Sequence, residues 1–332
     1  MKRWRTYILA GLCAGFLIAF LVVPILLAIG SGFVDEGQPS LYWLRTVFED
    51  IAVRRGMVNS LKLAVATTIG VFVLAVPLAV LANHFDFPGK RLATAALMVP
   101  MILPPFVGAL AMRKMLAHEL GSINLILSAI GLPKFDWLGG SGFTGVVIME
   151  VLHLYPIMFL NASAALANVD PTMVEASRNL GAGRWRTFWR VTLPLIRPGL
   201  FAGGTIVFIW AFTELGTPLM FDYHDVLPVQ IYDRLNQLDT TPKVYSMVFV
   251  MLSAAVAFYG IGKMLFGRGA AATAGRGVAA VSRKAGPAAV AGIWAAYGMV
   301  ILVGVLPHVG VLLMSVSERW SGTILPASYT LD

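Results

Sequence analysis

The chain has 332 residues, of which 58% are hydrophobic and 13% are charged. Soluble domains carry about 45–50% apolar and about 25% charged residues, so the composition excludes an ordinary soluble protein and indicates one that lies in a lipid bilayer. The formal net charge is +8, but the basic residues are spread over several loops instead of one stripe, which argues against nucleic-acid binding. The single cysteine, Cys13, excludes an intrachain disulfide and a cysteine-based metal cluster.

Seven apolar stretches are long enough to cross a bilayer as helices, which takes about 20 predominantly apolar residues. We expect these spans at residues 7–30, 57–82, 92–112, 142–168, 196–222, 244–266 and 289–314. The first follows a basic start, as a signal peptide does, but its apolar run is too long for one, so we interpret it as an uncleaved span. The sequence therefore predicts an all-α fold, a polytopic transmembrane helix bundle.

The distribution of Lys and Arg gives the orientation, because these residues accumulate on the cytoplasmic side of short loops. With a cytoplasmic N-terminus, the inner segments hold Lys90, Arg91 and the arginine-rich stretches after the fourth and sixth spans. Most acidic residues, Asp222 and Asp225 among them, then lie outside. We therefore expect the N-terminus in the cytoplasm.

Two patterns predict irregular or close-packed helices. Pro100, Pro104 and Pro105 interrupt the third span, and each removes a backbone donor, so a kink or an unwound stretch is expected there. Gly199 and Gly203 form a G-x-x-x-G pattern at the start of the fifth span, which allows close helix approach. Both patterns fit plain packing and gating equally well.

Ionisable residues inside the spans are the candidates for a translocation path. Lys62, Glu150 and Glu214 fall within spans, where such groups usually face protein or water. Glu150 and Glu214 are each expected roughly 12 Å from the outer end of their span, at 1.5 Å per residue. They either pair with Lys62 or, together with His153, line the path. Glu150 and His153 lack the partners of a metal motif, so we expect neither a metal nor a catalytic site.

The segment between the fourth and fifth spans contains clear helix signals. Asp170 can cap a helix that starts at Pro171, and Gly181 suits the left-handed residue that ends one, so we expect a helix over 171–180. A second helical stretch follows, and it carries these aromatic residues on one side: Trp185, Phe188 and Trp189. An ordinary pair of amphipathic interfacial helices is the alternative interpretation.

The same segment contains a specific motif: Glu175-Ala176-Ser177, three residues, Gly181, nine residues, Val191, Thr192, Leu193-Pro194. It resembles the loop of type I ABC-importer permeases, Glu-Ala-Ala, three residues, Gly, nine residues, Ile, one residue, Leu-Pro. Ser177 and Val191 are the two departures. In that family the loop, residues 170–194 here, docks on a cytoplasmic ATPase. The resemblance implies these docking residues: Glu175, Ala176, Ser177, Gly181, Leu193 and Pro194.

This resemblance implies a type I ABC importer permease in the bacterial inner (cytoplasmic) membrane. The chain is then a transport subunit and not an enzyme. It has no Gly-x-x-x-x-Gly-Lys-Ser/Thr phosphate-binding loop, so we expect no cofactor in this chain, with ATP and Mg bound by the partner ATPase. The implied partners are two cytoplasmic ATPase subunits, a periplasmic or surface-tethered substrate-binding protein, a second permease half and the lipid bilayer.

A faint internal repeat suggests two permease halves. Residues 21–37 resemble residues 304–320, with Pro24 matching Pro307. We interpret residues 1–266 as a six-span permease unit, 267–288 as a Gly- and Ala-rich cytoplasmic linker and 289–332 as the first span of a truncated second unit. A natural seven-span protein is the alternative. On the first interpretation, the chain alone should not transport.

The substrate follows only from a weaker resemblance. Residues 214–218 and 221–232 are similar to permeases of the iron(III) uptake family. We therefore expect iron(III), with thiamine, phosphonate and polyamine importers as alternatives. A secondary transporter would have no use for the docking loop, and an intramembrane enzyme would need a catalytic set that the sequence lacks.

Overall fold

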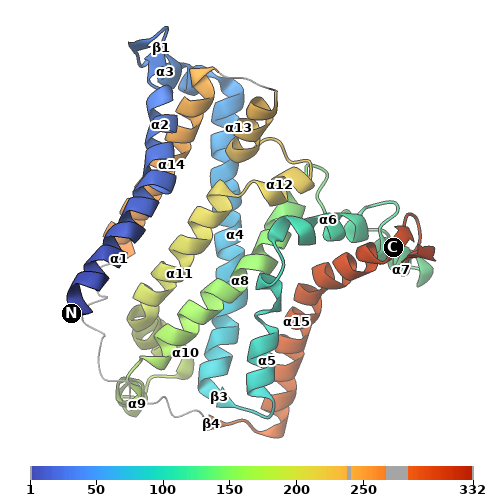
Figure 1. Ribbon diagram of the computed structural model, residues 1–332. Coiled ribbons are helices and arrows are strands. Elements are labelled where there is room, and N and C mark those ends of the chain that lie inside the picture. The colour runs from blue at the N-terminus through green and yellow to red at the C-terminus, as the bar shows by residue number, and fades with distance from the viewer. Residues whose placement is uncertain (1, 238–240, 267–282, 331–332) are drawn as a thin grey trace. The chain divides into compact units, whose positions relative to one another are not determined.

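The computed structural model describes residues 2–237, 241–266 and 283–330 (Figure 1). Most of the predicted linker, 267–282, lies outside these ranges. The described residues are predominantly helical, and their strands form three two-stranded pairs. The predicted all-α fold is confirmed.

The helices and strands follow in chain order. The first part contains α1 (Lys2–Leu17), η1 (Ile18–Val22), α2 (Val23–Ser31), β1 (Val34–Asp35), β2 (Gln38–Pro39), α3 (Tyr42–Glu49), α4 (Ile51–His84) and β3 (Phe85–Asp86). The middle contains α5 (Lys90–Ala96), η2 (Val99–Met101), α6 (Pro105–Leu116), α7 (Ser122–Ala129), α8 (Phe143–Ala167), α9 (Pro171–Asn179), α10 (Arg184–Thr187), η3 (Phe188–Thr192) and α11 (Leu193–Thr213). The last part contains α12 (Gly216–Met220), α13 (Leu227–Asn236), α14 (Pro242–Phe266), β4 (Arg283–Lys284), α15 (Pro287–Ser315), β5 (Ser317–Arg319) and β6 (Ser328–Tyr329).

Six helical segments of the described chain are long and apolar enough to cross a membrane, and they correspond to six of the seven predicted spans. The remaining span is broken: the segments Lys90–Met101 and Pro105–Leu116 meet at an angle of 90°. The predicted kink is confirmed, and it lies where the prolines remove backbone donors.

The predicted end of the fifth span was wrong. The helix α11 stops at Thr213 and does not run to residue 222, because Glu214 takes an extended conformation with φ −66° and ψ 129°. The short helix α12 then starts at Gly216. Glu214 therefore lies at a helix end, and the depth expected for it within a continuous span does not apply.

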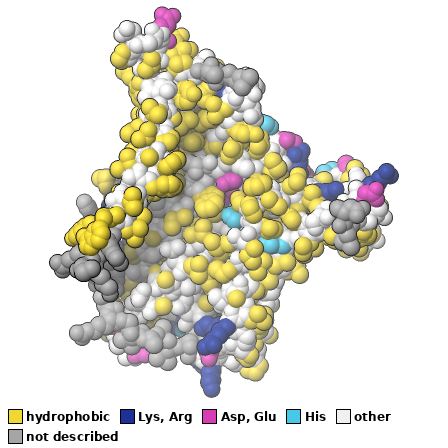
Figure 2. Space-filling view, in the orientation of Figure 1, with side chains coloured by type: hydrophobic (Ala, Val, Ile, Leu, Met, Phe, Trp, Pro, Cys, Tyr) yellow, Lys and Arg dark blue, Asp and Glu magenta, His cyan; other side chains and the backbone are white. Residues whose placement is uncertain are grey.

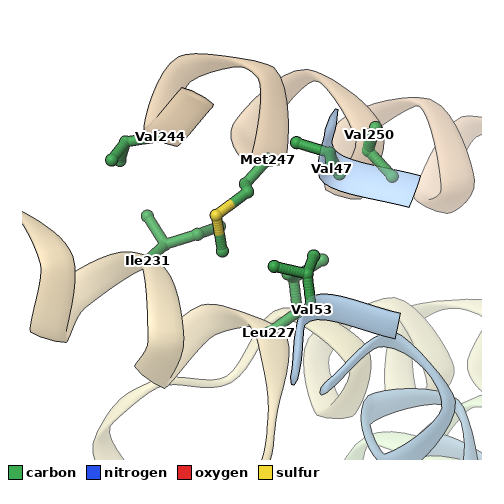
Figure 3. Close-up of a cluster of buried hydrophobic side chains, with 7 residues drawn as sticks. All are labelled: Val47, Val53, Leu227, Ile231, Val244, Met247 and Val250. Atoms are coloured by element: carbon green, nitrogen blue, oxygen red, sulfur yellow. The ribbon is translucent and has the colours of Figure 1, made fainter. Parts of the chain in front are cut away.

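The chain divides into two compact units, which we describe separately. The first comprises Met1–Asn59 and Asp225–Ala257. Its core joins α3, the start of α4, α13 and α14 (Figure 3), and consists of Val47, Val53, Leu227, Ile231, Val244, Met247 and Val250. The Ser246 hydroxyl donates a 2.7 Å hydrogen bond to the Gly32 carbonyl, which fixes the end of α2 against α14. The apolar side chains of α1 remain exposed, as a helix in lipid allows.

The second unit comprises Ser60–His224 and Phe258–Asp332. The helices α8 and α11 pack closely at the predicted glycine pattern, since a Cβ atom on Gly199 would lie 2.5 Å from the Ala165 Cβ atom. The helix α15 packs on α6, where a Cβ atom on Gly310 would lie 2.9 Å from the Ala111 Cβ atom. The helix after the predicted repeat boundary, α15, therefore packs on a helix that precedes this boundary.

The two segments of the internal repeat have similar local structures. The helix α2 is followed by the antiparallel pair β1–β2, and α15 is followed by the antiparallel pair β5–β6. The strands β1 and β5 begin at Val34 and Ser317, which are separated by the same offset as Pro24 and Pro307. This local likeness agrees with the repeat, while the assignment of 289–332 to a second permease unit stays a prediction.

Asp50 connects three helices of the first unit and provides a test of its stability. Its Oδ1 atom accepts from the Ala52 N–H at the start of α4, and its Oδ2 atom lies 2.6 Å from Lys243 Nζ and 3.3 Å from an Arg234 nitrogen. Asp50→Asn keeps a capping oxygen but loses the charge, so it should destabilise this unit. Asp50→Ala should cost about 0.5–2 kcal/mol more, because the cap is lost as well.

Thermal unfolding of the detergent-solubilised chain, followed by circular dichroism, measures both changes. The control is Glu49→Gln, which breaks the exposed Arg45–Glu49 pair and should cost no more than about 1 kcal/mol. A loss for Asp50→Asn no larger than that of the control would contradict the connecting role.

The loss of stability in Asp50→Asn should depend on pH. Burial alone would raise the pKa of Asp50, but hydrogen bonds from Lys243 and from the Val53 and Ala52 N–H groups outweigh it and lower the pKa. A carboxylate with a lowered pKa stabilises the fold above its ordinary value of 3.8, and the contribution is lost as the pH falls below it. The melting temperatures of wild type and Asp50→Asn should therefore converge at acid pH. A constant difference would show that the carboxylate charge is not its source.

Candidate functional site

The predicted docking loop forms a well-defined helical turn. Asp170 caps α9, since its carboxylate accepts from the Thr172 N–H at 2.9 Å, and hydrogen bonds from the Thr172 hydroxyl and N–H lower the Asp170 pKa. At the other end, Gly181 has φ +82° and donates to the Arg178 carbonyl, while the Ala182 N–H donates to the Ser177 carbonyl. This pair of bonds is a Schellman ending. The predicted helix and its left-handed glycine are confirmed.

After this turn the chain runs through α10 and η3 directly into α11. The segment η3 is a π-helix, a conformation found mostly as short insertions in α-helices, often at functional sites. The Ser177 and Thr187 hydroxyls lie 3.1 Å apart and connect α9 to α10. Leu193 and Pro194 form the first turn of α11, where proline leaves no N–H unpaired.

The surface of this loop is apolar and basic. Leu180 is 88% exposed and Trp185 is 74% exposed, and the Trp185 and Trp189 rings meet edge to face at 5.6 Å. Glu175 and Ala176 are also exposed. The arginines exposed on the loop are Arg178, Arg184, Arg186 and Arg190. Exposed aromatic and arginine side chains of this kind are enriched at protein–protein interfaces.

The motif residues have two different roles in this geometry. Ser177 and Gly181 shape the turn, and Leu193 and Pro194 start the helix that follows. Glu175 and Ala176 point to the outside of the turn, where the described residues give the Glu175 carboxylate no hydrogen-bond or ion-pair partner. The exposed pair is therefore available for contact with another chain.

Glu150 is almost completely buried in α8. Its Oε2 atom accepts a 2.8 Å hydrogen bond from the Thr67 hydroxyl of α4, while its Oε1 atom has no hydrogen-bond partner among the described residues. Lys62 is exposed on α4 and pairs with neither Glu150 nor Glu214 in the described part of the chain. The ion pair considered from the sequence is therefore not formed here.

Glu214 organises the break between α11 and α12. Its Oε1 atom accepts from the Gly216 and Thr217 N–H groups at 3.1 and 3.2 Å, and its Oε2 atom accepts from the Trp210 indole at 3.0 Å. The carboxylate thus pairs the free N–H groups at the start of α12. The sequence pattern did not indicate this role, because it placed Glu214 within a continuous helix.

The bend in the third span is completed by side chains from neighbouring helices. In a regular helix the Pro100 carbonyl would accept from the N–H of residue 104, but Pro104 has none. The His153 Nδ1 atom lies 3.1 Å from that carbonyl instead. Since a carbonyl only accepts, Nδ1 carries the proton. His153 is 8% exposed and bonded to the bend, while its predicted place in a translocation path stays a prediction.

Two further side chains support the bend. The Tyr155 hydroxyl donates to the Leu97 carbonyl at 2.8 Å, and the His308 Nε2 atom lies 3.0 Å from the Val99 carbonyl. His308 comes from α15, and sequence reasoning missed it because no local pattern connects residues 99 and 308. The bend in the third span therefore depends on both α8 and α15.

A groove of about 620 Å³ runs along α11 and ends at Glu214. Its polar lining consists of Thr205, Trp210, Thr213, Glu214 and Tyr259, with no Lys or Arg among the lining residues. The His153 and Trp210 rings are 5.8 Å apart, and the Trp210 indole donates to the Glu214 carboxylate. Figure 2 shows acidic and histidine side chains close together on this face. Of the four candidate path residues, Glu214 alone is among the described residues that line the groove, and His153 lies behind it against Trp210.

Comparisons with known proteins agree with this architecture. Residues 72–268 match the family model described as a binding-protein-dependent transport system inner membrane component. The chain is 32% identical over 237 residues to a putative ferric transport system permease of Haemophilus influenzae. The aligned region covers 69% of this chain and 36% of that relative. It is also 32% identical over 233 residues to a probable molybdenum ABC transporter permease of Haloferax volcanii. That aligned region covers 70% of this chain and 79% of the relative.

A solved structure has a similar fold. The crystal structure of a bacterial ABC transporter involved in alginate import contains a chain that matches with a TM-score of 0.65 and 18% identity. The match covers 81% of this chain and 97% of that chain. At this level of identity the likeness concerns the fold alone.

The two carboxylates should respond differently to amide substitution. In Glu214→Gln, the amide nitrogen must face either the Trp210 indole or the backbone N–H groups, which leaves a donor unpaired and should cost about 1–3 kcal/mol. In Glu150→Gln, the retained oxygen still accepts from Thr67 and no existing hydrogen bond is broken, so the loss of stability should be smaller than in Glu214→Gln. Thermal unfolding measured by tryptophan fluorescence tests the difference. Equal losses in the two variants would contradict the assigned hydrogen bonds.

Proposed function

This chain belongs to the family of inner membrane components of binding-protein-dependent transport systems, the ABC-importer permeases, and from this premise we propose that it imports iron(III) through coupling to a separate ATPase. As a multi-pass member of this family, it is a transport subunit with the all-α fold of such permeases. The proposal concerns its docking partner, cargo and orientation.

The observation that carries the docking proposal is the exposed, hydrogen-bonded turn at residues 170–194. Leu180 and Trp185 present apolar surface beyond the membrane helices, and Glu175 is exposed with no partner among the described residues. A cytoplasmic ATPase with a complementary groove would bury these side chains. We place this loop and the N-terminus in the cytoplasm, in agreement with the basic inner loops.

The connection between the loop and the groove suggests how ATP hydrolysis would drive transport. The segment Arg184–Thr213 is a continuous helical span that begins in the loop and ends next to Glu214. Movement of the loop by a closing ATPase would shift Trp210 and Glu214 at the far end of the same helix. Helices transmit such displacements because their backbone hydrogen bonds resist compression and bending.

The charge of the groove supports a cationic cargo. Its polar lining includes the Glu214 carboxylate and neutral groups, without a Lys or Arg, and Glu150 lies nearby. A negatively charged oxyanion such as molybdate would be repelled by the carboxylate, whereas iron(III) would be attracted. The relative named for ferric transport agrees with a positively charged cargo. The relative named for molybdenum supports the alternative, an oxyanion cargo.

The remaining partners follow from the family. Transport that depends on a binding protein requires such a protein on the outer face, opposite the docking loop. We further propose that residues 289–332 begin a second permease unit, because the internal repeat and the strand pairs that follow α2 and α15 are alike. A complete transporter would then contain two docking loops and two ATPases.

The docking proposal predicts different effects of two neighbouring glycines. Gly181 has φ +82°, which an L-residue adopts at a cost of about 1–2 kcal/mol, so Gly181→Ala should distort the turn. Gly183 has φ −65° and open space around its Cβ position, so Gly183→Ala is the matched control. In the assembled transporter, Gly181→Ala should reduce co-purification with the ATPase and the coupling of ATP hydrolysis to uptake.

The readouts are the ATPase retained on the affinity-tagged permease and the cargo taken up per ATP hydrolysed in proteoliposomes. Gly183→Ala should match wild type in both. Retention and coupling that are unchanged in Gly181→Ala and in Glu175→Ala would overturn the docking proposal.

The cargo proposal is tested separately in the same proteoliposomes. With the cognate binding protein present, iron(III) should stimulate ATP hydrolysis and accumulate in the lumen, while molybdate should do neither. Radioactive iron and molybdate uptake measure the difference directly. Uptake of molybdate without uptake of iron(III) would overturn the assignment of cargo and leave the docking proposal intact.

A further inference from the structure

An open groove of about 930 Å³ lies beside α5. Its wall is formed by apolar side chains and its mouth by basic ones: Phe87, Leu92, Ala95 and Met98, with Lys90 and Arg91. We call it the α5 groove. A groove with a cationic mouth and an apolar wall matches the shape of a phospholipid, whose anionic headgroup is joined to apolar chains.

Two basic residues line the α5 groove, and two more lie on the neighbouring strand β4. Lys90 Nζ is held by a 2.9 Å hydrogen bond to the Phe85 carbonyl, and Arg91 is exposed without a partner among the described residues. The strand β4 pairs in parallel with β3, which places Arg283 and Lys284 beside Phe85 and Asp86. Asp86 is the one acidic residue in the groove lining, so the positive charge is in excess.

A tryptophan packs beside the α5 groove. The Trp294 indole donates a 3.2 Å hydrogen bond to the Pro88 carbonyl, and its ring meets Phe87 edge to face at 6.3 Å. Tryptophan is enriched at membrane–water interfaces, which supports an interfacial level for this end of the groove. Beyond the basic mouth, Leu92 is 72% exposed and Ile102 is 73% exposed, so the broken span continues as an apolar surface.

The α5 groove lies at the same end of its unit as the predicted docking loop. Arg178, Arg184 and Arg283 are near enough to His84 to act on its ring electrostatically. Figure 1 shows β3 and β4 at the end that carries α9 and α10, and Figure 2 shows Lys and Arg side chains gathered at this end. On the proposed orientation, this end faces the cytoplasmic leaflet.

We propose that the α5 groove binds an anionic phospholipid of the cytoplasmic leaflet. The phosphate and its negative charge face Lys90 and Arg91, with Arg283 and Lys284 close by, and an acyl chain follows Leu92 and Ile102. An anionic lipid is favoured over a zwitterionic one because of the charges in the lining. Asp86 is the one acid there that could bind a choline or amine group, whereas two basic residues face the phosphate. The site stabilises the start of the broken span and depends on neither the ATPase nor the cargo.

Native mass spectrometry of the detergent-solubilised full chain tests the proposal. The chain is titrated with dioctanoyl phosphatidylglycerol or with dioctanoyl phosphatidylcholine, and the bound lipid gives an apparent Kd. Phosphatidylglycerol should bind more tightly. The pair Lys90→Gln and Arg91→Gln should weaken its binding roughly fivefold for each charge removed, or about 25-fold together.

The matched control removes two exposed arginines from the other end of α4, Arg54→Gln with Arg55→Gln. It should leave the Kd unchanged, and circular dichroism verifies that both double variants are folded. A second pair, Arg283→Gln with Lys284→Gln, tests the contribution of β4 and should also weaken binding.

Four results would overturn the proposal. Equal binding of the two lipids, or an equal loss in the Arg54 and Arg55 control, would show that no specific anionic site exists. Displacement of the lipid by inorganic phosphate would indicate a site for a soluble anion. Dimers of the chain that dissociate in the Lys90 and Arg91 variant would show that a second copy covers the groove.

Discussion

The hydrogen bond between the His153 ring and the Pro100 carbonyl shows how this fold pairs a backbone group that its own helix leaves without a partner. Within lipid, every backbone polar group needs a partner from the protein, because no water is available. Pro104 deprives the Pro100 carbonyl of its partner in the helix, so the third span can bend only where another helix supplies a donor. His153 supplies that donor, and Tyr155 and His308 support the carbonyls of the preceding turn.

This constraint also arranges the parts that the proposed function uses. Because donors for the bend come from α8 and α15, these helices pack on the broken span, and α8 in turn packs on α11. The helix α11 connects the exposed turn at residues 170–194 with Glu214, whose carboxylate pairs the free N–H groups where the helix ends. The bend in the third span and the end of α11 thus each have polar partners from the protein, and the acidic groove and the basic turn lie at the two ends of one helix.

The sequence predicts those features that depend on local chemistry. Hydropathy located the spans, the prolines located the bend, and Asp170 and Gly181 located the ends of α9, since each signal acts within a few residues. The end of α11 was missed because Glu214 stops the helix through contacts with Trp210 and α12 that apolar composition does not reveal. Thr67 and His308 were also missed, because their partners lie 83 and 209 residues away in the chain.

The central claim is that the turn between α8 and α11 is the contact surface for a cytoplasmic ATPase. Site-specific photocrosslinking in the assembled transporter tests it most directly, with a photoreactive residue in place of Leu180, which is 88% exposed, or of Leu41, which is 65% exposed. The account predicts a covalent adduct with the ATPase from position 180 and none from position 41. An ATPase adduct from position 41, or its absence from position 180 in a transporter that hydrolyses ATP, would contradict the claim.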